Sequence, residues 1–223
     1  MDQVWQTYEA WVAYFDILGY KKKIENLPLP LLQLQVDETI HDLQRGAAEF
    51  PENIDCLFYA DTFIFYSRSN EDRNCPGILS GSTHFIERCL SKGMPVRGAI
   101  SFGKIAVGHE KKALVGKAYL ECHNYAEDQN WIGLVLAPSA TKKVQELGLD
   151  PTHHGFINRD VPLRKCSKSA DRVYAYTFCR GEKNFTNPLL KKVEEMQDLS
   201  PASVKDKYEN TLQFIRKYDR VIK

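Results

Sequence analysis

Apolar residues fall into short blocks along the chain, and their spacing predicts strands and helices in turn. Residues 11–15 are apolar and rich in strand formers, and Asp16 and Gly19 follow them, so we expect a strand that ends in a turn. Between residues 31 and 50 apolar positions recur at helical spacing, and Pro51 closes the segment. The chain therefore opens with a strand and a helix.

The second apolar block covers residues 56–66 and is interrupted only near its middle. It is too long for one ordinary strand. The sequence at residues 60–62 supplies a turn, which predicts a hairpin with Asp61 at its tip. A polar loop over residues 67–77 and a helix over 78–92, stopped by Gly93, are expected to follow.

In the rest of the chain, segments with the hydrophobic spacing of strands alternate with segments that have the spacing of helices. Residues 96–107 fit either one long strand or a second hairpin. Further along we expect a helix over 114–127 entered at Gly116, a strand over 131–137, a helix over 139–147 with Ser139 as its N-cap, a strand over 173–179, and two charged helices after residue 187. This order predicts an α+β or α/β fold with one mixed sheet and helices over it.

Length and charge narrow the class of protein. A chain of 223 residues has room for one large domain, or for one domain and a small extension. Lys and Arg number 30 against 29 Asp and Glu, which gives a formal net charge of +1. That balance argues against a protein that coats DNA or RNA and against a polybasic membrane-surface protein. A single phosphate-binding cleft stays compatible with it, because a few local cations suffice.

Cysteines and apolar runs indicate the compartment. The six cysteines are scattered without a CxxC pair, which predicts reduced thiols. No apolar stretch approaches the roughly 20 residues that span a bilayer. Asp2 stands where a signal peptide would carry positive charge. We therefore expect a cytoplasmic protein without a membrane or nucleic-acid partner.

Two acidic residues stand out from their apolar surroundings. Asp16 follows a predicted strand, and Asp61 lies at a predicted hairpin tip. A carboxylate in such surroundings is costly unless it is paired or bound to a metal. If the two strands are neighbours, both carboxylates lie at one sheet edge and can share divalent cations. The alternative is that each aspartate caps a turn.

Two further features concern anions. The turn at residues 18–20, around Gly19, can point backbone N–H groups at a phosphate, although a glycine after a strand often marks only a turn. Arg97 enters an otherwise apolar strand, which suggests an anionic ligand or a buried carboxylate partner. An exposed arginine on an edge strand is the alternative.

Three segments taken together resemble a known family. AYFDILGY, FYADTFIFYS and PVRGAISFG followed by LVGKAYLE are similar, in order and spacing, to the catalytic domain of class III nucleotidyl cyclases. More narrowly, FDILG, RGAISFG, GKAYLE and QNWIGLVLAPS resemble the bacterial pyrimidine cyclases of Pycsar anti-phage defence. Those enzymes convert UTP or CTP to a cyclic mononucleotide that activates a toxic effector.

The resemblance implies a set of site residues. Asp16 and Asp61 match the metal-binding and catalytic aspartates, and Ile17 matches the residue whose carbonyl also binds metal, with two Mn²⁺ or Mg²⁺ ions per site. The phosphate-cradling turn matches Leu18, Gly19 and Tyr20. Arg97 matches the arginine that contacts the triphosphate in the same half-site.

The chain departs from the family at the positions that recognise the nucleotide base and on the later helix. The purine-reading positions, Lys for adenine or Glu for guanine at the first of them, fall at Leu57 and Ala113, neither of which can hydrogen-bond a purine edge. That absence fits a pyrimidine cyclase or an inactive one. We expect Tyr59 to stack on the base. The transition-state Asn and Arg fall at Leu120 and Asn124; Asn124 can still donate a hydrogen bond, or can belong to a solvated helix face.

These matches imply an α+β cyclase-like catalytic domain over residues 1–186, with a mixed sheet covered by helices, and a C-terminal helical extension over 187–223. They also imply a homodimer in which each site takes its metal aspartates and arginine from one subunit, and its base-reading and helix residues from the other. The expected activity is conversion of UTP to 3′,5′-cyclic UMP for a separate effector. The alternatives are a cytidylate cyclase and an inactive nucleotide-binding sensor module.

Overall fold

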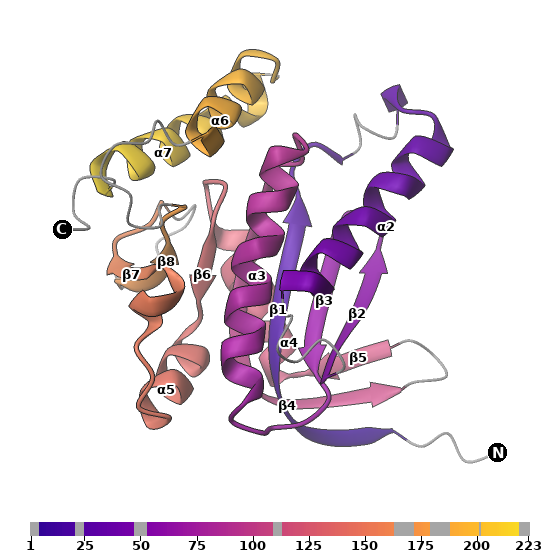
Figure 1. Cartoon of the computed structure of the whole chain (residues 1–223), viewed down its shortest axis with the longest axis vertical. Helices are drawn as coiled ribbons and strands as arrows, with labels where there is room; N and C mark the ends of the chain where they lie inside the picture. Colours follow the sequence, from indigo (N-terminus) through magenta and orange to yellow (C-terminus); the bar gives the residue numbers. More distant parts are fainter. Residues whose placement is uncertain are drawn as a thin grey trace.

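The computed structural model describes residues 5–20, 25–46, 53–108, 113–162, 172–178, 188–200 and 202–218. These residues form one mixed sheet with helices on both of its faces (Figure 1). The long α3 (Asn74–Ser91) and its neighbour α2 (Leu29–Gly46) lie over one face, and α4 (Lys117–Asp128) lies behind the sheet. The fold is α+β, as the order of elements predicted.

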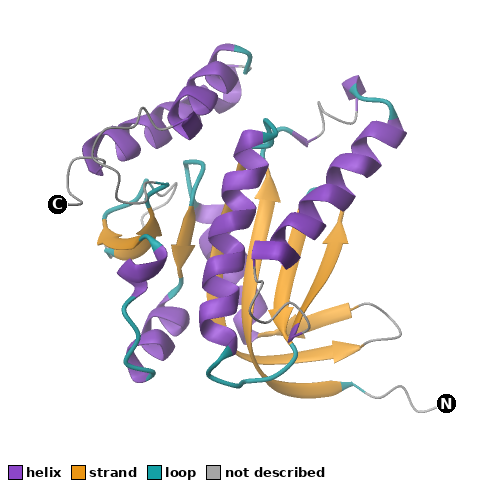
Figure 2. Cartoon of the chain, viewed as in Figure 1, coloured by secondary structure: helices purple, strands orange, loops and turns teal. Residues whose placement is uncertain are grey.

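The sheet has eight strands among the described residues, in the order β2-β3-β1-β4-β6-β8-β7, with β5 paired to β4. Its central strands are long, and most of its pairs are antiparallel, with β4 and β6 parallel. The strands are β1 (Gln6–Ile17), β2 (Ile54–Tyr59), β3 (Thr62–Ser67), β4 (Val96–Gly108), β5 (Ala113–Gly116), β6 (Leu134–Leu136), β7 (Phe156–Arg159) and β8 (Val173–Tyr176). Figure 2 shows the central strands running behind α2 and α3.

Side chains of β1 alternate between two different cores. Phe15 packs on Phe85 of α3 with ring centroids 4.5 Å apart, and both rings are fully buried. The preceding residue, Tyr14, faces the other way and meets His123 of α4 with centroids 5.2 Å apart. Because strand side chains alternate with a period of two, Asp16 shares the α4 face with Tyr14.

The predicted hairpin is confirmed. β2 and β3 pair from Ile54 opposite Ser67 to Tyr59 opposite Thr62, and the turn is made by Ala60 and Asp61. Ala60 has a positive φ of 55°, which tight hairpin turns require. Residues 96–107 form one long strand, which confirms that interpretation; a hairpin within this block is wrong, because the antiparallel partner β5 lies beyond it.

Other predicted boundaries shift. The strand expected over residues 131–137 is confined to Leu134–Leu136. Ser139 is not the N-cap of α5 (Pro138–Glu146); Ala137 is, because the Ser139 hydroxyl is held by Glu121 and by the Phe102 amide. The helix expected over residues 31–50 is α2. Residues 47–50, the last of the predicted helix, lie outside the described residues. β7 was not predicted.

The C-terminal part contains the two expected helices, α6 (Pro188–Asp198) and α7 (Ala202–Tyr218). The two helices pack on each other beside the β6–β8 end of the sheet (Figure 1). Phe214 of α7 lies against Trp131, with ring centroids 4.4 Å apart. The C-terminal helices are therefore in contact with the segment that precedes β6.

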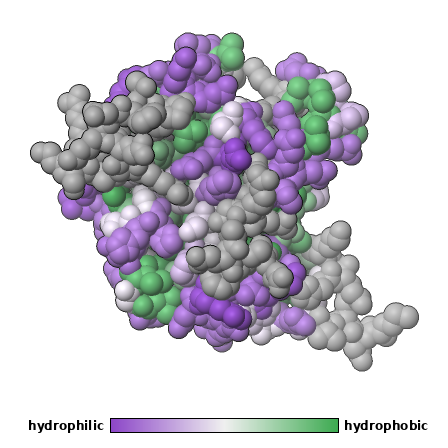
Figure 3. Space-filling view, viewed as in Figure 1, coloured by the Kyte–Doolittle hydropathy of each residue, from purple (hydrophilic) through white to green (hydrophobic). Residues whose placement is uncertain are grey.

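The outer surface over α2 and α3 is mainly hydrophilic (Figure 3). Its clearest apolar patch lies at the start of α2, where Leu29, Leu31 and Leu34 are exposed. Among the described residues, none of the helices has both the length and the apolar composition to cross a membrane.

Candidate functional site

The two predicted aspartates meet at the end of β1. Asp16 lies opposite Thr62 in the β1–β3 pairing, and Thr62 directly follows Asp61. The Ile17 amide donates to the Asp61 carbonyl at 2.9 Å, so the hairpin tip is fixed against the end of the strand. The two strands beside the aspartates, β1 and β3, are therefore neighbours, as sharing of a cation by Asp16 and Asp61 requires.

The Asp16 carboxyl is in an environment that resists ionisation. Burial raises its pKa, and the negative charges of Glu127 and Asp61 raise it further, while Arg97 lowers it without cancelling the effect of burial. The influence of Asp61 on Asp16 indicates that the two groups are close enough to repel each other when both are charged. A divalent cation between them would relieve that repulsion.

Arg97 is buried and points into this cluster. Its Nε donates to Asp16 Oδ2 at 2.8 Å, its Nη2 to Glu127 Oε1 at 2.5 Å, and its Nη1 to the Glu127 carbonyl at 2.7 Å. Of the interpretations left open by the sequence, the buried carboxylate partner is therefore the one observed, and the exposed edge arginine is wrong. Contact between Arg97 and a triphosphate stays a prediction.

The turn after Asp16 has the expected shape. Gly19 has φ of +74°, in the left-handed region that favours glycine. The Leu18 amide is already used, since it donates to the Pro95 carbonyl at 2.8 Å. A phosphate cradle here would therefore depend on the amides of Gly19 and Tyr20. The Tyr20 pKa is raised by burial and by the charge of Asp61, which places its phenol near that carboxylate.

The donor atoms at this end of the sheet suit a hard cation. The carboxylates of Asp16 and Asp61 and the Ile17 carbonyl are oxygen ligands of the type that Mg²⁺ and Mn²⁺ prefer. Among the described residues, no cluster of three or more His, Cys, Asp or Glu side chains could hold a metal by itself. The set fits ions that complete their coordination with water and substrate phosphates.

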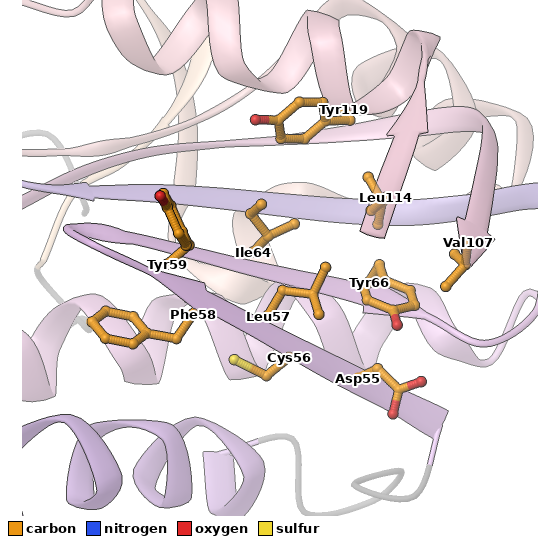
Figure 4. A pocket seen from close by; sticks show the side chains of 10 residues that line it. All are labelled: Asp55, Cys56, Leu57, Phe58, Tyr59, Ile64, Tyr66, Val107, Leu114 and Tyr119. Atoms are coloured by element: carbon orange, nitrogen blue, oxygen red, sulfur yellow. The ribbon is translucent and has the colours of Figure 1, made fainter. Parts of the chain in front are cut away.

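A pocket of about 710 Å³ opens beside the hairpin, on the face that carries α4. Leu57, Tyr59 and Ile64 point into it from the hairpin, while Cys56 and Phe58 point the opposite way (Figure 4). Leu114 and Tyr119 form the other wall. Most of the described residues that line it are apolar or aromatic, and Asp55 is the one charged residue among them.

The two base-reading positions differ in placement. Leu57 is half-buried in the pocket wall, and Tyr59 is 84% exposed at its rim. Ala113, the second position, is not among the lining residues, whereas its neighbour Leu114 is. Among the described residues that line the pocket, none is a lysine or glutamate at the place where the resemblance puts the purine reader.

The helix positions lie apart from the carboxylates. Leu120 is 57% exposed and Asn124 is also exposed. Asn124 Oδ1 lies 3.5 Å from His123 Nδ1. Asn124 is exposed, and none of the described hydrogen bonds or ion pairs of Asp16 and Arg97 goes to it.

Sequence reasoning missed Glu127, the second partner of Arg97. A signal existed, because Glu127 lies in the last turn of α4, where the helix dipole disfavours an acidic side chain unless a cation compensates it. Tyr14 and Thr62 were also missed. Their hydroxyls are 3.4 Å apart beside Asp16, and burial raises the pKa of Tyr14 to about 12.

Comparison with known proteins supports the fold. Neither a protein-family model nor a curated protein sequence matches this chain. Among solved structures, it is similar to the catalytic core of a rhodopsin-guanylyl cyclase with converted specificity in complex with ATPαS, at a TM-score of 0.59 and 10% identity over 77% of this chain and 97% of that one.

Two adenylyl cyclases are similar to the same degree. The adenylyl cyclase CyaB from P. aeruginosa matches with a TM-score of 0.54 and 12% identity, over 82% of this chain and 99% of that one. A bacterial light-regulated adenylyl cyclase matches with a TM-score of 0.53 and 14% identity, over 95% and 98%. The chain therefore has the class III nucleotidyl cyclase fold.

Proposed function

We propose that this protein is a nucleotidyl cyclase that converts UTP to 3′,5′-cyclic UMP and pyrophosphate, with Mn²⁺ or Mg²⁺ as cofactor. The observation that carries the proposal is the meeting of Asp16, Ile17 and Asp61 at the end of β1, beside the Gly19 turn, within a class III cyclase fold. This arrangement supplies oxygen ligands and backbone donors at the same place, which is what a metal-bound triphosphate needs.

The reaction joins the 3′-oxygen of the ribose to the α-phosphorus and breaks the bond from that phosphorus to the bridging oxygen of pyrophosphate. The 3′-hydroxyl proton leaves to solvent or to a basic group. When bound, divalent cations would acidify the hydroxyl and offset the charge of the leaving pyrophosphate. The chain contributes the carboxylates of Asp16 and Asp61, the amides of Gly19 and Tyr20, and the fixed cation of Arg97.

Pyrimidine preference rests on the pocket beside the hairpin. Leu57 offers no hydrogen bond to a purine edge, and selective sites depend on such bonds. Tyr59 is exposed at the rim, where its ring could stack on any base. The choice of UTP over CTP in this proposal rests only on the narrower resemblance to pyrimidine cyclases, so a cytidylate cyclase is the first alternative.

Homodimerisation would complete the site. Leu120, Asn124 and Tyr59 are all exposed on the side of the hairpin and α4, where a second subunit could bring them against its own carboxylates. In this proposal the protein acts in the cytoplasm, and its cyclic product activates a separate effector in anti-phage defence.

The test is to incubate the purified protein with each of the four nucleoside triphosphates and Mn²⁺, and to identify products by chromatography and mass spectrometry. Cyclic UMP supports the proposal, and cyclic CMP supports the alternative. Binding without turnover would favour the inactive sensor module, which the exposed position of Asn124 and the replacement at Leu120 make a specific second candidate.

Shared sites are tested by mixing two inactive variants, Asp61→Asn and Asn124→Ala. Random pairing makes half of the dimers mixed, and each mixed dimer has one intact site of two, so recovery of about a quarter of wild-type activity is expected. Absence of recovery from two folded dimers, or full activity in a monomer, would contradict the shared-site model.

A further inference from the structure

Residues 127–133, the end of α4 and the loop that leads to β6, form a segment that contacts Arg97 directly. Three of the described hydrogen bonds from its guanidinium go to this segment: Nη2 to the Glu127 carboxylate, and Nη1 to the carbonyls of Glu127 and Gln129 at 2.7 and 3.4 Å. The fourth goes from Nε to Asp16. The position of Arg97 beside Asp16 therefore depends on where this segment lies.

On one side the segment is bonded to the strand that carries Arg97. The buried Gln129 donates from Nε2 to the Gly98 carbonyl at 2.8 Å, and the Gly98 amide donates to the Gly133 carbonyl at 2.8 Å. Gly98 has no room for a side chain, because a Cβ there would lie 2.5 Å from the Phe15 ring. The segment and β4 therefore form one closely packed unit.

On its other side the segment is held by α7. The Ile132 amide donates to Thr211 Oγ1 at 2.8 Å, and Asn210 Nδ2 donates to the Asn130 carbonyl at 2.8 Å. Thr211 is fully buried, as are Trp131 and Ile132. The contact of Trp131 with Phe214 completes this interface.

We propose that Thr211 and Asn210 are positioning residues for the candidate site. By holding residues 130–132, they fix the Glu127–Gln129 backbone, which in turn holds Arg97 against Asp16. The C-terminal extension thus sets the geometry of the carboxylate cluster, although none of its described residues belongs to that cluster. This inference rests on the proposed function only for its effect on turnover; the coupling itself concerns the position of Arg97.

Thr211→Val is the sharpest test, since it keeps the shape of the side chain and removes the acceptor of a buried amide. An unsatisfied buried donor should raise the open population of the segment by about 5- to 100-fold. The direct readout is hydrogen exchange of the Arg97 Nε–H, followed by nitrogen-15 NMR and assigned by its loss in Arg97→Lys. We expect faster exchange in Thr211→Val, a smaller change in the less buried Asn210→Ala, and wild-type exchange in Thr211→Ser.

The second readout is binding of Mn²⁺ alone, measured by titration, and the third is the split of cyclase kinetics into kcat and KM. Weaker Mn²⁺ binding and lower kcat are expected in Thr211→Val. Arg216→Gln is the matched control, because it breaks the exposed pair of Arg216 with Glu194 of α6 at 2.7 Å without touching the segment, and it should leave all three readouts unchanged.

All measurements are made well below the unfolding temperature of each variant. If folded Thr211→Val and Asn210→Ala keep wild-type Arg97 exchange and Mn²⁺ affinity, α7 is only a structural support and the inference is overturned. If wild-type protein makes no cyclic product while Thr211→Val still accelerates Arg97 exchange, the proposed function fails and the positioning role stands.

Discussion

The candidate site consists of a closed ionic region and an open apolar one, and they differ in what holds them. In the ionic region Arg97 is buried and pairs with the largely buried Asp16, and the partly exposed Glu127 completes the pairing from the same chain. In the apolar region the pocket beside the hairpin is lined by Leu57 and ends at Tyr59, which is almost fully exposed.

The difference indicates which region one chain can complete. A buried arginine needs its partners in place before it can leave water, so the ionic region has to form as the protein folds. An exposed aromatic rim gains nothing from folding and is suited to a ligand or a second subunit.

Removing a proposed metal-binding carboxylate should have the largest effect, and the effect should be on activity alone. Asp61→Asn keeps the shape of the hairpin tip and removes one charge from the cation site. We expect product formation to fall by about 10³-fold or more, on the scale of losing the cation's stabilisation of the transition state. Circular dichroism and thermal unfolding should stay close to wild type, because Asp61 is partly exposed. Activity retained in both Asp61→Asn and Asp16→Asn would remove the metal assignment.

Breaking the ionic region should cost stability. Arg97→Met leaves the buried Asp16 carboxylate without its cation, and we expect the free energy of unfolding to fall by about 3 kcal/mol. Arg68→Met is the matched control, since Arg68 pairs with Asp55 at 2.7 Å on the surface and should cost at most about 1 kcal/mol. Urea unfolding measures both. Equal losses in the two variants would mean that the buried pair is not special.

The apolar region should respond in the opposite way. Tyr59→Ala removes the proposed stacking surface, so KM for the nucleotide should rise by about 5- to 100-fold. Stability should change by less than about 0.5 kcal/mol, because the side chain is 84% exposed. Tyr59→Phe keeps the ring and serves as the control. A wild-type KM in Tyr59→Ala would exclude stacking at this position.

The sequence was sufficient for features that local rules determine. The hairpin with Asp61 at its tip could be predicted because an apolar run longer than one strand has to turn, and its few polar residues mark the place. The neighbouring positions of Asp16 and Asp61 then depended only on strand order. The Ser139 cap was wrong because a tertiary contact with Glu121 captured the hydroxyl that a local rule assigned to the helix end.

The partners of Arg97 were out of reach for a different reason. Glu127 lies 30 positions after Arg97 in the chain. It belongs to the end of α4, which packs on the face of the sheet opposite α2 and α3. No periodicity relates the two residues, and only the misplaced acidic charge at the end of α4 gave a hint. The same holds for Thr211 and Ile132, whose 79-residue separation is closed by packing alone.

The smallest effect concerns the pH dependence of stability. Burial raises the pKa of Asp16, so the folded protein keeps its proton to a higher pH than the unfolded chain does. The wild type should therefore lose stability as pH rises above the ordinary aspartate value of 3.8 and through the raised one. Asp16→Asn lacks this proton, and its advantage over wild type should be absent near pH 3.5, grow with pH and then level off. The exposed Asp150 should cause the opposite pH dependence of stability, because the hydrogen bond from the Thr152 amide lowers its pKa. Urea titrations from pH 3.5 to 8 measure the pH dependence of stability that each of these two aspartates causes. If the stability of Asp16→Asn relative to wild type is lower at pH 7 than at pH 4, the pairing with Arg97 outweighs burial.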